Sequence, residues 1–204
     1  DVVCLDRDHI IDDDDTSRDA IDMYYYTLFK NLTSIKLFNT GITGDIVHLK
    51  SLLNLTKIRI TGTTVFGDIA HLNSLPNLTK IILFNTGVTG DIENLKSLLK
   101  LTRIDLRGTG VFGDIAHLKS LPKLTEIYLN STGVTGDIMH LKSLPKLKNI
   151  YLYDTGVTGD IKHLKSLPKL TGIDLANTGV YGDENAFVEY RESAGLEVCD
   201  IEIY

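Results

Sequence analysis

The sequence contains few of the residues that mark several common protein classes. It has only two cysteines, Cys4 and Cys199, among 204 residues, too few for a disulfide-dense secreted scaffold. No segment approaches the roughly 18 consecutive apolar residues that a membrane-spanning helix needs, and the first residues lack the basic and apolar regions of a secretory signal. We therefore expect no membrane insertion. Because Asp1 stands in place of Met, we also expect a processed chain.

Familiar catalytic patterns are absent as well. The sequence has no nucleophile elbow, no phosphate-binding glycine loop, no zinc-ligand pair and no HExxH motif. Its composition, with 43% hydrophobic and 24% charged residues, is that of an ordinary folded domain. We therefore expect a folded protein that is not an enzyme and that needs no cofactor or metal.

The sequence does contain a repeat of 23 residues, present in seven copies without insertion or deletion. Residues 78–100, LTKIILFNTGVTGDIENLKSLLK, are a fair consensus, with apolar residues at repeat positions 1, 4, 6, 11, 15, 18 and 21. Positions 4 and 6 lie on one face of a short strand, and positions 3, 5 and 7 on the other. One unit cannot bury its own apolar residues, so neighbouring coils must stack as a solenoid. The copies begin at Leu32, Leu55, Leu78, Leu101, Leu124, Leu147 and Leu170.

This repeat resembles the leucine-rich repeat family, and within it the subclass familiar from plant proteins. L-x-x-I-x-L at positions 1 to 6 and T-G-D-I at positions 12 to 15 carry the resemblance, which covers residues 32 to about 183. It implies an α/β fold, a right-handed horseshoe-shaped solenoid with a concave parallel β-sheet and short helical turns on the convex side. It also implies a binding module, by analogy with other members. Position 9, usually Asn in the family, is Thr here, and we expect its hydroxyl to bond loop backbone between coils.

Segments outside the repeats are expected to cover both ends of the solenoid. Residues 1–31 are predicted to form an N-terminal helical cap, with a helix from Asp15 or Thr16 to about Lys30. Residues 32–182 hold the seven repeats. Residues 183–204 are predicted to form a cap with a helix over 184–194 and a strand over 196–203. The side chains expected to cover the first coil are Ile21, Tyr24, Tyr25, Leu28 and Phe29.

Two polar residues recur on the predicted helical side. Aspartate occupies position 14 in every copy, and histidine occupies position 17 in five. We interpret the aspartate as the N-cap of the helical turn that follows, and a row of metal sites is the alternative. The aspartates are Asp45, Asp68, Asp91, Asp114, Asp137, Asp160 and Asp183, and the histidines are His48, His71, His117, His140 and His163.

Information about the ligand is expected where the copies differ, at positions 3, 5 and 7 of the concave sheet. The first four copies are basic there, and the fifth and sixth present tyrosines. Arg and Tyr are frequent at the energetic centres of interfaces. The alternative is that the tyrosines only stack on one another across strands. The candidate ligand-binding residues are Arg103, Arg107, Tyr128, Tyr151, Tyr153, Lys57, Arg59 and Lys80.

The net charge of −6 conceals a basic repeat region between two acidic ends. Residues 1–31 carry nine acidic and three basic side chains, residues 183–204 seven and one, and residues 32–182 eleven and 17. We therefore expect a protein or peptide ligand of acidic or mixed charge. Like-charged ends disfavour head-to-tail stacking of solenoids, so we expect a monomer.

Two other functions are considered. Electrostatic binding of a polyanion, either an acidic glycan or a nucleic acid, is the first. Acids such as Asp105 and Glu126 interrupt the basic stripe and make nucleic acid an unlikely partner. Ice binding by the threonines at position 2 is the second.

The cellular compartment stays open. The chain lacks the cysteine-paired caps usual in extracellular plant members, which favours an intracellular location. Seven coils at about 4.7 to 4.9 Å each separate the two cysteines, whereas a disulfide permits a Cα separation of about 4.4 to 6.8 Å. We therefore predict two free thiols.

Overall fold

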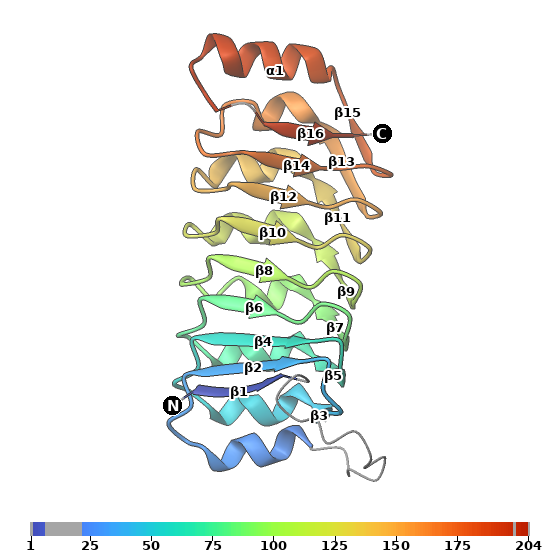
Figure 1. Ribbon diagram of the computed structural model, residues 1–204. Helices are drawn as coiled ribbons and strands as arrows, with labels where there is room; N and C mark the ends of the chain where they lie inside the picture. Colours follow the sequence, from blue (N-terminus) through green and yellow to red (C-terminus); the bar gives the residue numbers. More distant parts are fainter. Residues whose placement is uncertain (1, 7–21, 198, 204) are drawn as a thin grey trace.

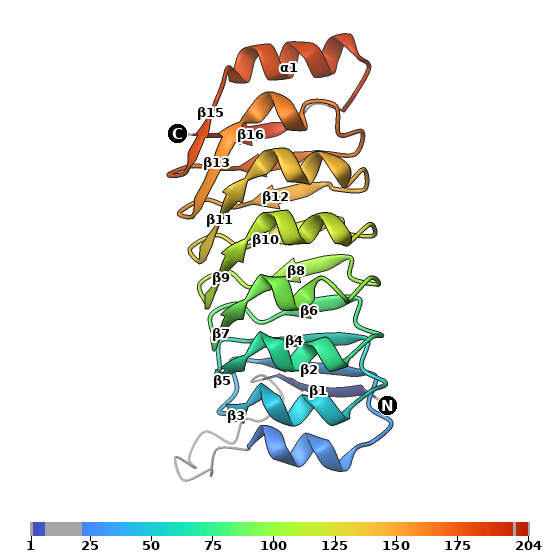
Figure 2. The ribbon, with the colours of Figure 1, turned by 180° about the vertical axis from the view of Figure 1, so that it is seen from behind.

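Stacked coils of nearly constant length make up the molecule (Figure 1). The computed structural model describes residues 2–6, 22–197 and 199–203. Each repeat contributes a strand to a front sheet and a strand to a second sheet, and each of the first six repeats also contributes a short 3-10 helix. Figure 1 looks onto the front sheet, and Figure 2 shows the 3-10 helices from behind. No helix among the described residues is long and apolar enough to cross a membrane.

The front sheet has nine parallel strands within the described ranges, in the order β1-β2-β4-β6-β8-β10-β12-β14-β16. From β2 to β14 each residue lies beside its equivalent one repeat later, as Ser34 does beside Lys57. At position 2 the Thr33 carbonyl accepts both the N–H of Thr56, at 2.8 Å, and its hydroxyl, at 2.9 Å. The strands are β1 (Val2–Asp6), β2 (Ser34–Phe38), β4 (Lys57–Thr61), β6 (Lys80–Ile82), β8 (Arg103–Asp105), β10 (Glu126–Tyr128), β12 (Asn149–Tyr151), β14 (Gly172–Asp174) and β16 (Asp200–Glu202).

A second parallel sheet, which the sequence analysis did not predict, has seven strands in the described part of the chain. Here neighbouring coils are shifted by two positions, so that Phe66 at position 12 pairs with Gly87 at position 10. Glycine fits there because an added Cβ on Gly87 would lie only 3.3 Å from the Cβ of Phe66. The strands are β3 (Thr43–Asp45), β5 (Thr64–Asp68), β7 (Gly87–Asp91), β9 (Gly110–Asp114), β11 (Gly133–Asp137), β13 (Gly156–Asp160) and β15 (Gly179–Tyr181).

A 3-10 helix forms the back of the N-terminal coil and of each of the first six repeats. Such a helix has three residues per turn, which matches the spacing of the buried positions 15 and 18, Ile46 and Leu49 in the first repeat. These side chains meet the inward residues of the front sheet in one continuous apolar core. The helices are η2 (Met23–Leu28), η3 (Ile46–Ser51), η4 (Ile69–Ser74), η5 (Ile92–Leu95), η6 (Ile115–Ser120), η7 (Ile138–Ser143) and η8 (Ile161–Leu164).

The aspartate at position 14 caps these helices, which confirms the capping interpretation. The Asp45 carboxylate accepts the N–H of Val47 at 2.8 Å, and the same bond recurs in the following repeats. The Asp91 carboxylate also lies against Gly113 of the next coil, where φ is +110° and an added Cβ would clash with it. Among the described residues, no three His, Cys, Asp or Glu side chains are grouped as metal ligands.

The N-terminal region adds a coil with a strand, β1, that was not predicted; of the expected helix up to about Lys30, the described residues form the 3-10 helix η2. Strand β1 pairs with β2 at an offset of 32 residues, against 23 between β2 and β4. Asp22 caps η2 as position 14 does elsewhere, and it forms a bridge with Thr43 of the second sheet. The chain between Asp6 and Asp22 is therefore nine residues longer than its equivalent in the first repeat. The predicted N-caps Asp15 and Thr16 lie outside the described residues.

The prediction of which side chains cover the core of the first repeat is wrong for the residues that the structure describes. A 3-10 helix places Met23 and Tyr26 inward, and both are buried. Burial raises the pKa of Tyr26 to about 12. The side chains of Tyr24, Tyr25, Leu28 and Phe29 are instead at least half exposed, because they lie off the inward positions of this narrower helix. Ile21 lies outside the described residues.

At the C-terminus, α1 (Glu184–Ser193) and β16 occupy the intervals where a helix and a strand are expected. Asp183 caps α1 by accepting the N–H of Ala186 at 3.0 Å. The fully buried Arg191 was not foreseen. Its guanidinium donates to the carbonyls of Leu167, at 2.9 Å, and Leu170, at 2.7 Å. Backbone acceptors at the junction of the sixth and seventh repeats are thereby satisfied.

Position 8 is held in the left-handed region in every repeat, with φ between +47° and +64°. This conformation favours Gly and tolerates Asn or Asp. The variation at this position therefore reflects the turn. The residues are Asn39, Gly62, Asn85, Gly108, Ser131, Asp154 and Asn177.

Replacing Gly113 by Ala is expected to lower the free energy of unfolding by about 2 kcal/mol or more, because a Cβ at this positive φ meets the Asp91 carboxylate. Gly41→Ala is the matched control, since an added Cβ there meets nothing within 4 Å. Urea unfolding measures both. Equal effects of the two substitutions would contradict the role assigned to Gly113.

Cys199 is a buried free thiol beside β16, at the opposite edge of the front sheet from Cys4 in β1. Burial raises the pKa of Cys199 to about 11. The thiol is therefore protonated and unreactive at pH 8. In a Cys4→Ser variant we expect negligible reaction with Ellman's reagent until denaturant is added, and then one equivalent. Rapid reaction of the native protein would contradict this placement.

Candidate functional site

The residues that vary between repeats lie on the outward surface of the front sheet. In β4, for example, Lys57 and Arg59 are exposed, whereas Ile58 and Ile60 are buried. We name this surface, formed by repeat positions 3, 5 and 7 of β2 to β14, the open face. It has two parts of different character, a basic hollow over β2 to β8 and a cluster of paired charges and rings over β8 to β12.

The basic hollow has a volume of about 270 Å³. Among the described residues, no acidic side chain forms an ion pair with Lys36, Lys57, Arg59 or Lys80. The Arg59 guanidinium instead lies 4.6 Å from the centre of the Phe38 ring. The hollow thus gathers four positive charges without a partner in the described structure. Its lining is Ser34, Lys36, Lys57, Ile58, Arg59, Lys80, Ile82 and Arg103.

Two donors that line the hollow lack a hydrogen-bond acceptor. The side chain of Ser34 is 7% exposed, and its hydroxyl has no partner among the described residues. The Nε atom of Arg103 is buried and unpartnered in the same way. An unsatisfied buried polar group costs free energy that a bound acceptor recovers.

Asp105 organises the second part of the open face. Its side chain is fully buried and accepts hydrogen bonds from Arg103 Nη2, at 3.0 Å, and Arg107 Nε, at 2.9 Å. The three residues alternate along the chain and so project to one side. Arg103 also binds Glu126 of the next strand at 2.6 Å. Burial opposes the charge of Arg103, but the bond to Asp105 and the charge of Glu126 raise its pKa.

Aromatic rings extend this cluster. The Arg103 guanidinium lies 4.5 Å from the centre of the Tyr128 ring. Tyr128 in turn stacks on Tyr151, with ring centroids 5.1 Å apart and planes inclined by 17°. Burial raises the pKa of the Tyr128 hydroxyl. The structure therefore brings Arg103, Arg107, Tyr128 and Tyr151 together, and the cross-strand stacking considered as an alternative is present.

The other candidate residues lie elsewhere on the open face. Lys57, Arg59 and Lys80 line the basic hollow. Tyr153 follows the end of β12, and in the described structure its ring contacts no other aromatic ring. Sequence reasoning did not select Ser34 or Lys36. The signal for Lys36 was its position beside Arg59, at position 5 of neighbouring repeats.

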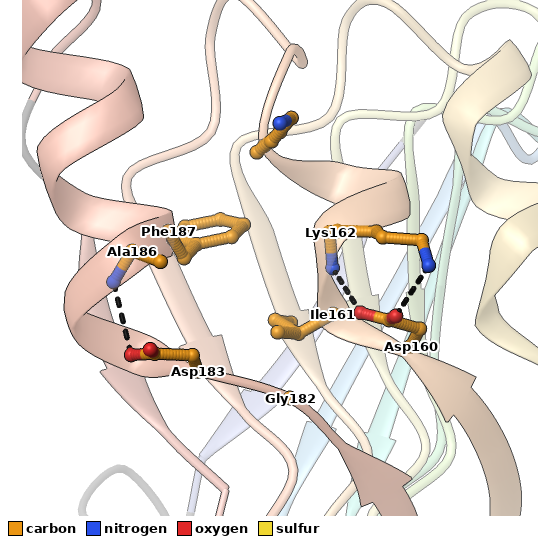
Figure 3. Close-up of a pocket in the computed structure, with 8 residues that line it drawn as sticks. Asp160, Ile161, Lys162, Gly182, Asp183, Ala186 and Phe187 are labelled. Carbon is orange, nitrogen blue, oxygen red and sulfur yellow. Dashed lines mark hydrogen bonds and ion pairs between the residues drawn. The ribbon is translucent and has the colours of Figure 1, made fainter.

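A second hollow, of about 230 Å³, lies between η8 of the sixth repeat and α1 (Figure 3). Its two carboxylates already have partners. Asp160 accepts the N–H of Lys162 and forms an ion pair with its ammonium group at 2.7 Å, while Asp183 caps α1. The remaining walls include Ile161 and Phe187. With its charges satisfied, this hollow is less suited to recognition than the basic hollow.

No protein-family model and no curated protein sequence matches this chain. Its coils nevertheless superimpose on solved structures. The LRR ectodomain of the Arabidopsis receptor kinase HAESA, in complex with an IDA peptide hormone ligand, matches with a TM-score of 0.71 and 22% identity over 78% of this chain and 28% of that one. Internalin C2 from Listeria monocytogenes matches with a TM-score of 0.54 and 23% identity, over 80% and 77%.

The chain has the leucine-rich-repeat fold. Pollen Receptor Kinase 3 shares it, with a TM-score of 0.64 and 25% identity over 74% of this chain and 76% of that one. The chain spans less than a third of the length of the HAESA ectodomain.

Threonine at position 9, where the leucine-rich-repeat pattern usually has Asn, has a different role from the one expected. The hydroxyl of Thr86 at position 9 donates to the carbonyl of Leu83 at 2.6 Å, and that of Thr178 donates to Leu175 at 2.6 Å. Both bonds stay within one coil. The prediction of bonds between coils is wrong because a threonine side chain is short and reaches the turn three residues back. This role leaves the open face unchanged.

The substitution Asp105→Asn is expected to lower the free energy of unfolding by about 2 to 3 kcal/mol, because it leaves two arginines beside a neutral buried amide. Glu126→Gln is the control and is expected to cost less than about 1 kcal/mol, since its ion pair is partly exposed. Thermal or urea unfolding measures the difference. An Asp105 variant as stable as the Glu126 variant would refute the organising role.

Proposed function

We propose that this protein is a non-catalytic recognition module that binds a protein or peptide ligand through its open face. The observation that supports the proposal is that different positions of the repeat serve either the fold or the variable surface. Positions 1, 4, 6, 11, 15, 18 and 21 supply the core, position 13 and position 14 hold the turns and caps, and positions 3, 5 and 7 carry side chains that differ between coils. These last positions are held on a rigid sheet, which limits the entropy lost on binding.

The chemistry of the open face suits such a ligand. Arginine and tyrosine supply large planar groups with polar edges, and Arg103, Arg107, Tyr128 and Tyr151 are already ordered by contacts with one another. The HAESA ectodomain, which shares the fold, was solved with a peptide hormone. RGFR1, another plant receptor of this fold, was solved with the peptide RGF2.

Binding of a polyanion is the second candidate, favoured by the four cations of the hollow that have no acidic partner in the described part of the chain. A long polyanion that continued along the open face would meet Glu126 and Asp174, which disfavours it. Ice binding has less support. The position 2 hydroxyls of Thr56, Thr79, Thr102 and Thr125 donate to carbonyls of the preceding coil and are occupied.

Selection from a random linear peptide library displayed on phage tests the proposal. Wild-type protein is expected to enrich peptides whose binding is lost on substitution of open-face residues, such as Lys57→Glu or Tyr151→Ala. Lys119→Glu on η6, at the back of the solenoid, is the control and is expected to leave binding intact. If no enriched peptide depends on the open face, the proposal is wrong.

A further inference from the structure

We infer that the basic hollow is a subsite for the carboxylates of a short acidic peptide segment. The inference rests on the proposed function and deepens it, because it assigns the charge and the docking place of the ligand. Its residues are Ser34, Lys36, Lys57, Arg59 and Lys80, with Arg103 at the border of the neighbouring cluster.

The first argument is the register of the front sheet. Lys36 lies directly beside Arg59, and Lys57 lies directly beside Lys80. Like charges at directly paired positions destabilise a sheet. The fold therefore has no structural need for this arrangement, and a bound anion relieves the repulsion. The contrast with β8 is informative, since there Asp105 and Glu126 neutralise the arginines beside them.

The second argument is the hydrogen-bonding capacity of the lining. Lysine ammonium and arginine guanidinium groups are donors only. The Ser34 hydroxyl and Arg103 Nε add two donors whose acceptors are missing among the described residues. A carboxylate accepts through both oxygens and has no donor, so it complements this set and gains charge-assisted hydrogen bonds.

The size of the hollow indicates a compact anionic segment. The four cations lie on three successive strands, β2, β4 and β6, which span about 9 to 10 Å at the usual strand spacing. An extended peptide covers about 3.3 Å per residue, so about three to four residues cross the cations. Four acidic residues, one for each cation, fit within that length. Beyond β6 the cations are already paired, so nothing favours a longer anion.

Fluorescence anisotropy with a labelled Gly-Ser peptide that carries an Asp-Glu-Asp-Glu core tests the inference. A second peptide with an Asn-Gln-Asn-Gln core is the uncharged probe. The double substitution Lys57→Glu and Arg59→Glu is expected to weaken binding of the acidic peptide by about tenfold or more. The matched double substitution Lys119→Glu and Lys142→Glu, on η6 and η7, changes the net charge equally and is expected to change affinity less than about twofold.

Ser34→Ala separates recognition from folding. Removing an unpartnered buried hydroxyl is expected to leave the unfolding midpoint unchanged or raised. The same substitution is expected to weaken binding of the acidic peptide by about fivefold to tenfold, through loss of a hydrogen bond to a charged group.

Three results would overturn the inference. They are equal binding of the acidic and uncharged peptides, equal weakening by the two double substitutions, and much tighter binding of heparin or a single-stranded oligonucleotide than of the acidic peptide at physiological salt. If the peptide library yields open-face ligands without acidic residues, this inference fails and the proposed function stands. If the library yields no open-face ligand, the proposed function fails.

Discussion

The whole molecule depends on the register that places each residue of the front sheet beside its equivalent 23 residues later. This register lets one threonine carbonyl accept two bonds from the next coil and stacks identical apolar residues into a continuous core. It also explains the most constant polar residues. Asp91, for instance, caps its own 3-10 helix and at the same time lies against Gly113 of the next coil. Each repeat is therefore constrained by its neighbours as well as by its own packing.

The same register determines which open-face side chains become neighbours in successive repeats. Because equivalent positions become neighbours, a charge on the open face meets the residue one repeat away. Around Asp105 the neighbours are complementary, and the result is an ordered cluster of ion pairs and rings. Around Lys57 they are alike, and the result is a hollow whose cations form no ion pair with any described acidic side chain. We consider the first a part of the binding surface that is already ordered, and the second the part that an acidic segment of the ligand completes.

The fold was predictable from the sequence because seven exact periods leave one arrangement in which the apolar residues are buried. The capping role of Asp45 and its equivalents followed from the same periodicity. The N-terminal coil was missed because its strand lies 32 residues before β2 and breaks the period. The second sheet was missed because its strands pair with a two-residue shift. The pairing of Arg103 with Asp105 and Glu126 was missed because columns of equivalent positions were compared without pairing each charge with its actual neighbours.

The central claim is that the acidic segment of a ligand docks on Lys36, Lys57, Arg59 and Lys80, which have no acidic partner among the described residues. A titration of isotope-labelled protein with the Asp-Glu-Asp-Glu peptide, followed by amide chemical shifts in NMR spectra, tests it most directly. We predict that the largest shifts occur at Ser34, Lys36, Lys57, Arg59 and Lys80, and that those at Tyr128 and Tyr151 remain small. Shifts centred on Tyr128 and Tyr151, or spread evenly over the surface, would contradict it.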